Sequence, residues 1–142
     1  SAQALASGAQ LADARALVAR AAREGPRNLK DLDFLPEVTT QVGACRSALK
    51  WSYAFAWACG SRWQAAELFA FYQGQLEAAV EALSGVMEAT NWEDLLSERG
   101  RKWERFRDKR SEVLSLSDAV RSCFNALHAH VEAMDLMLHV VT

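Results

Sequence analysis

The sequence predicts an all-α fold, an elongated antiparallel bundle of four to five helices that forms one domain over residues 1–142. Three observations support this class. Alanine, the best helix former, occurs 26 times, whereas the helix breakers glycine and proline occur only 7 and 2 times. Several long segments place apolar residues three or four positions apart, which is the spacing of one helix face. The alternating apolar and polar pattern of a half-buried strand is absent from the sequence.

The first helix is expected over residues 3–24, because Gly25-Pro26 stops it. Its apolar face consists mostly of alanine and therefore buries little area, so this is predicted to be the least stable helix.

The second helix is expected to begin near Asp33 and to end at Gly60, with Pro36 in the first turn, where its missing N–H costs nothing. Its apolar face recurs at helical spacing and comprises Val38, Val42, Cys45, Leu49 and Ala56. Three aromatic residues near its end are expected to thicken this face: Tyr53, Phe55 and Trp57.

The third helix is expected over residues 62–88, where apolar residues follow one another at spacings of three or four. They are Phe69, Tyr72, Leu76, Val80, Leu83 and Met87. Gly74 and Gly85 weaken this helix by roughly 1 kcal/mol each relative to alanine, unless a neighbouring helix requires close approach there.

The remaining segment follows a break at Thr90-Asn91, after which Glu93 and Asp94 favour a new helix N-terminus. One very long helix, or two in series, is expected from there to the C-terminus. Gly100 is a candidate kink, and residues 115–118 offer a cap for a restart. Continuity is favoured because the apolar positions differ by three, four or seven throughout; they are Trp103, Phe106, Val113, Val120, Phe124, Leu127, Val131, Met134 and Leu138.

The charge and cysteine content restrict the class of protein. Sixteen basic residues oppose 18 acidic ones, so the chain as a whole is not polybasic. An odd number of cysteines, without a CxxC pair, favours a reducing compartment. Because we find no signal peptide and no apolar run of membrane-spanning length, we expect a cytoplasmic or nuclear setting and no membrane partner. The chain begins at Ser1 without Met, so we expect a fragment of a longer protein.

Cysteine and histidine often carry catalytic or metal-binding chemistry, but their positions in this sequence predict packing roles. Cys45 and Cys123 lie on apolar faces, and Cys59 lies at a helix end without a nearby base. His128 and His130 are two positions apart and point away from each other on a helix, whereas zinc ligands on one helix prefer a spacing of three or four. Partial pairs of Asp135 with His128 or His139 are weak signals. We therefore expect no catalytic residue, no metal and no cofactor.

The clearest charge feature is the segment 99–110, which carries a local net charge of +5 and includes Trp103 and Phe106. Aromatic residues among basic ones can stack nucleic-acid bases, but both fit the apolar face, and the rest of the chain is acidic. No nucleic-acid partner is expected. The favoured interpretation is a solvated flank that can dock an acidic protein patch, with candidate contacts Arg101, Lys102, Arg105 and Lys109.

Two segments resemble a known family. Residues 44–57, ACRSALKWSYAFAW, and residues 67–85, ELFAFYQGQLEAAVEALSG, are similar to the Ariadne domain, the C-terminal helical domain of Ariadne-type RING-between-RING ubiquitin ligases. The matching positions are Cys45-Arg46, Leu49, Trp51-Ser52-Tyr53, Phe55, Phe69, Gln73, Leu76-Glu77, Glu81 and Leu83-Ser84-Gly85, with Phe34-Leu35 before them and the basic stretch 107–110 before Val113-Leu114 after them. The resemblance covers about residues 30–115.

The resemblance implies a regulatory domain that is not itself an enzyme, within a parent ubiquitin-protein transferase. Such a domain packs on the catalytic RING-like domain of the same chain and keeps it inactive until a neddylated cullin–RING complex displaces it. Glu81 corresponds to a family glutamate that contacts the catalytic domain. The family's Phe-Glu pair in the first helix has no counterpart, since positions 5–9 offer Ala, Ser and Gly, which leaves open whether autoinhibition is retained.

Two further classes of function stay as alternatives: a free-standing helical scaffold or adaptor, and, less favoured, a metal- or thiol-dependent enzyme. The side chains of Glu81 and Arg110 both lie near apolar faces, so they either pair within the domain or Glu81 faces outward. The resemblance favours the outward arrangement.

Overall fold

The structure, a computed structural model, describes residues 2–24, 32–59, 66–97 and 101–141. These residues form five helices and no strand: α1 (Ala2–Glu24), α2 (Phe34–Cys59), α3 (Ala66–Ala89), α4 (Trp92–Ser97) and α5 (Arg101–Val141). The predicted all-α class is confirmed.

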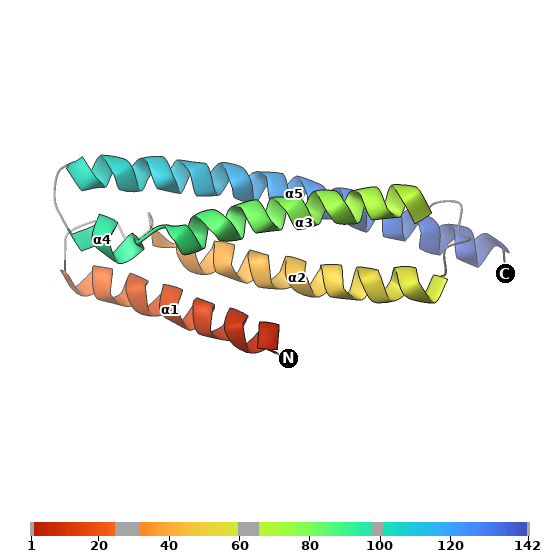
Figure 1. Ribbon diagram of the computed structural model, residues 1–142, viewed down its shortest axis with the longest axis horizontal. Helices are drawn as coiled ribbons and strands as arrows, with labels where there is room; N and C mark the ends of the chain where they lie inside the picture. The colour runs from red at the N-terminus through yellow and green to blue at the C-terminus, as the bar shows by residue number, and fades with distance from the viewer. Residues whose placement is uncertain (1, 25–31, 60–65, 98–100, 142) are drawn as a thin grey trace.

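The long helices lie side by side in an elongated bundle, each antiparallel to the long helix before it (Figure 1). Helix α3 contacts both α2 and α5, and α1 packs on α2 (Figure 1). The short helix α4 lies at the end of the bundle where the chain passes from α3 to α5 (Figure 1). The predicted antiparallel arrangement is therefore confirmed as well.

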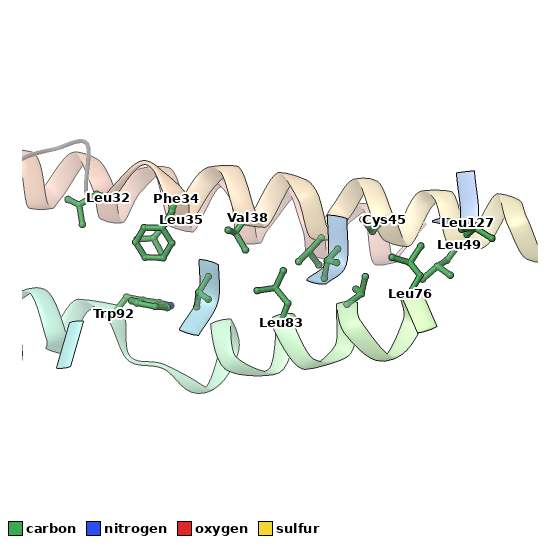
Figure 2. Close-up of a cluster of buried hydrophobic side chains, with 14 of the residues drawn as sticks. Leu32, Phe34, Leu35, Val38, Cys45, Leu49, Leu76, Leu83, Trp92 and Leu127 are labelled. Carbon is green, nitrogen blue, oxygen red and sulfur yellow. The ribbon is translucent and has the colours of Figure 1, made fainter. Parts of the chain in front are cut away.

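The core follows the predicted apolar faces. In α5 the fully buried residues recur every seven positions, at Phe106, Val113 and Val120. This heptad spacing is typical of helices that supercoil around one another. Side chains of α2, such as Val38 and Cys45, lie opposite Leu76 and Leu83 of α3, as Figure 2 shows. Each buried aliphatic or aromatic side chain contributes about 1.5–3 kcal/mol to the free energy of unfolding.

The predicted break between α3 and α4 is confirmed. Asn91 caps α4, because its side-chain Oδ1 accepts a hydrogen bond from the backbone N–H of Asp94 at 3.1 Å. Glu93 and Asp94 occupy the first turn, as expected for a helix N-terminus. The predicted stops at Gly25-Pro26 and Gly60 and the predicted kink at Gly100 lie outside the described residues.

Helix α5 runs without interruption for 41 residues, which confirms continuity through residues 115–118. Ser117 is buried in its apolar stripe, where its hydroxyl donates a hydrogen bond to Oε1 of Gln41 at 2.6 Å. The Nε2 atom of Gln41 donates in turn to the backbone carbonyl of Ser117 at 3.0 Å. Gln41 of α2 thus supplies the hydrogen-bond partner that the buried hydroxyl of Ser117 needs, and Ser117 does not begin a new helix.

The expectation that Tyr53 and Trp57 thicken the buried face of α2 is wrong. Tyr53 is 45% exposed and Trp57 87% exposed. Ser52 is the last buried position of α2. At about 100° per residue, Tyr53 and Trp57 lie roughly 100° and 140° around the helix from Ser52, whereas Phe55 lies only roughly 60° from it. Of the three aromatic residues only Phe55 packs inward, with its ring centroid 5.9 Å from that of Phe69.

Candidate interaction surface

A groove of about 770 Å³ lies between α3, α4 and α5, and we call it the α3/α5 groove. On α3 its lining includes Ala82, Gly85 and Ala89, which are spaced by three and four and so share one helix face. All three are exposed, and their small side chains leave the depression open. The groove therefore offers a surface on which the backbone of a partner can approach closely.

Charged side chains surround this floor and come from three helices. The acidic ones are Glu81, Asp94, Asp108 and Glu112, and the basic ones are Arg105 and Lys109. On α5, positions 105, 108, 109 and 112 share one face because they are three or four residues apart. The Nζ atom of Lys109 lies 3.0 Å from Oε2 of Glu112, and both side chains are partly exposed. Charges of both signs thus line the groove, and two of them form an ion pair within it.

Glu81 points outward, as expected, with 69% of its side chain exposed. Its partner within the domain is Arg46, whose Nη2 lies 3.9 Å from Oε1 of Glu81. Arg110 does not pair with Glu81: its guanidinium lies over the ring of Phe34, 5.6 Å from the centroid. Arg110 thereby remains close to the apolar stripe through a cation–π contact.

The structure brings three of the five predicted contact residues into one groove: Glu81, Arg105 and Lys109. The other two, Arg101 and Lys102, lie in the first turn of α5, but their side chains lie outside the described part of the chain.

The aromatic residues of the basic segment belong to the core. Phe106 is fully buried, and Trp103 stacks on it with ring centroids 5.1 Å apart and an interplanar angle of 16°. Phe106 also meets Trp92 edge-to-face at 6.1 Å. These contacts support the favoured interpretation of the segment as a charged flank over packed aromatic rings.

His128, His130 and the three cysteines do not line the groove, and the side chains of Asp135 and His139 lie outside the described residues. Within the described ranges no group of three His, Cys, Asp or Glu residues is arranged to hold a metal ion. The ring of His130 lies against Phe69 and Tyr72 at 5.9 and 5.2 Å. Burial raises the pKa of the Cys45 thiol, which disfavours the reactive thiolate.

Sequence reasoning missed the polar contacts between helices. Arg46 donates to Oγ of Ser84 at 2.9 Å, and the hydroxyl of Ser84 donates to Oε1 of Glu88 at 3.1 Å. Gln73 donates to Oγ of Ser52 at 3.0 Å inside the α2–α3 interface. In the sequence, these contacts are indicated by small polar residues, such as Ser52 and Ser84, that recur within otherwise apolar helix faces.

None of the helices, over the residues that the structure describes, is both long and apolar enough to cross a membrane. Comparisons of the chain with models of protein families, with curated proteins and with solved structures find no match.

Proposed function

We propose that this chain is a non-catalytic, Ariadne-type protein-interaction domain of a RING-between-RING ubiquitin ligase, and that it acts through the α3/α5 groove. The observation that carries the proposal is that Glu81 of α3 lines the same groove as Arg105 and Lys109 of α5, which lie more than 20 residues further along the chain. The ligase context rests on the sequence resemblance over residues 30–115.

The chemistry of the groove suits protein recognition. Exposed charges of both signs steer a partner and fix its orientation, whereas a small apolar floor permits close contact. In this proposal Glu81 faces a basic group on the catalytic RING-like domain of the same parent chain. Arg105 and Lys109 face an acidic patch, for which the neddylated cullin–RING complex is the proposed partner.

The groove is tested by reversing one exposed charge within it. Arg105→Glu is expected to weaken binding of this chain to a neddylated cullin–RING complex at least tenfold, as measured by isothermal titration calorimetry. The difference in affinity between Arg105→Glu and the original chain should diminish at high salt, because salt screens interactions between exposed charges.

Arg121→Glu is the matched control, since Arg121 is also exposed on α5 but pairs with Asp118 outside the groove, at 2.9 Å. Equal affinity of both variants and the original chain would reject the groove as the docking surface. Absence of any binding by the original chain would favour the free-standing scaffold.

A further inference from the structure

A second concavity, which we call the α1 cavity, is lined by residues of α1, α2 and α3 and by Trp92 of α4, and it has a volume of about 220 Å³. Its deepest side chains are Leu35, Val42 and Trp92, which are all buried. Helix α1 contributes Ala14 and Leu17 to the wall. Because the inner face of α1 is largely alanine, it leaves space that a larger side chain would fill.

The rim of the α1 cavity is acidic. Asp13 of α1 and Glu88 of α3 line it, and both are exposed. Glu88 is held in place by two hydrogen bonds to its Oε1, from the hydroxyl of Ser84 at 3.1 Å and from Nε2 of Gln10 at 3.2 Å. Arg46 bonds to Ser84 but does not line the cavity, and no basic side chain is among its described lining residues.

We propose that the α1 cavity binds a compact apolar group that carries a positive charge. The apolar part would lie on Leu35 and Trp92, and the charged nitrogen would pair with Asp13 and Glu88 at the rim. A dry apolar cavity of ~150 Å³ accepts benzene, whereas sites for drug-sized ligands occupy ~300–1,000 Å³. The α1 cavity is intermediate in volume, so it fits a phenyl or branched aliphatic group with a short linker.

This chemistry has two sources, a free organic amine or an apolar residue beside a lysine or arginine in a peptide. The site lies on a different face of α3 from the α3/α5 groove, so it is independent of the ubiquitin-ligase proposal.

The test uses the full chain and three probes of similar shape, titrated by NMR with the indole resonances as reporters. Benzylammonium is expected to bind at least tenfold more tightly than benzyl alcohol, and phenylacetate is expected not to bind. A fourth probe, acetyl-Phe-Lys-amide, distinguishes the sources: tighter binding than benzylammonium assigns the site to peptides, and weaker binding assigns it to free amines.

Two variants make the test specific. Ala14→Leu fills the cavity and is expected to abolish binding while the melting temperature stays equal or rises. Asp13→Asn should retain the fold and reduce the preference for benzylammonium over benzyl alcohol severalfold, whereas Glu67→Gln, an exposed change elsewhere on α3, should have no effect. Equal affinity for all three probes, no saturable binding, or binding undiminished by Ala14→Leu would overturn the proposal.

Discussion

Arg46 shows how single polar residues set the register of this bundle. Its guanidinium reaches Ser84 at 2.9 Å and approaches Glu81 at 3.9 Å, so one side chain of α2 contacts two positions of α3. The hydroxyl of Ser84 donates a hydrogen bond to Glu88, which also accepts a hydrogen bond from Gln10 of α1. A sliding of any of these helices by one turn would separate donors from acceptors, so the network favours one register.

Among the described groups, Tyr53 has the most strongly raised pKa that we find. Its hydroxyl donates to Oε2 of Glu77 at 2.6 Å. This hydrogen bond, then desolvation, then the charge of Glu77 raise the pKa of Tyr53 to about 12, from an ordinary value of 10.0. Because the folded state holds this proton more tightly, the contact stabilises the fold below about pH 10, and this contribution is lost as the pH rises towards 12.

Absorbance at 295 nm during alkaline titration measures this shift directly. The difference between the original chain and Tyr53→Phe should show a phenolate that forms near pH 12. Glu77→Gln should move this titration back towards 10, the ordinary value. A Tyr53 transition at its ordinary pKa in the original chain would show that the hydrogen bond is not formed in solution.

At the scale of the helix, glycine gives the simplest prediction. Gly74 lies in the middle of α3, is exposed, and a Cβ added there would meet nothing within 4 Å. The same holds for Gly85, so neither glycine serves a close helix–helix contact within the described domain. Gly74→Ala should therefore raise the free energy of unfolding by roughly 1 kcal/mol, through helix propensity alone.

Urea denaturation of Gly74→Ala checks this value, with an unchanged dependence on urea concentration as the sign that the native state is the same. A lower midpoint would mean that the space at Gly74 is occupied in solution.

Phe106 joins the helices at the α4 end of the bundle. It is fully buried and its ring meets those of Phe34, Trp92 and Trp103. Phe106→Ala should cost about 3–5 kcal/mol, because it removes this packing and leaves a cavity. The control is Phe71→Ala, since Phe71 is 56% exposed, and it should cost much less. Equal losses in thermal unfolding experiments would place Phe106 outside the core.

The helices were predictable because apolar spacing is a local property. The stripe from Phe106 to Leu127 repeats at seven residues whatever lies opposite, and the structure buries it. Polar partners were not predictable, because they depend on the register between helices. The contact of Glu81 with Arg46 and the position of Arg110 over Phe34 are set by that register.

For the whole molecule, the candidate site was predictable only in part. The basic flank and Glu81 were identified as separate features, one by charge density and one by family resemblance. Their convergence in the α3/α5 groove required the antiparallel packing of α3 on α5. The small residues Ala82, Gly85 and Ala89, which form the floor, resemble ordinary helix-forming residues in the sequence of this alanine-rich chain.

The central claim is that Glu81, within the α3/α5 groove, contacts the catalytic domain of the parent ligase and keeps it inactive, and Glu81→Ala tests it most directly. Glu81 is exposed and its ion pair with Arg46 is long, so its removal should change the free energy of unfolding by no more than about 0.5 kcal/mol. The same change in the parent ligase should raise basal discharge of ubiquitin from its conjugating enzyme severalfold, and Glu67→Ala should leave discharge unchanged. Unchanged discharge with a large drop in the denaturation midpoint would contradict the account and leave Glu81 a structural residue.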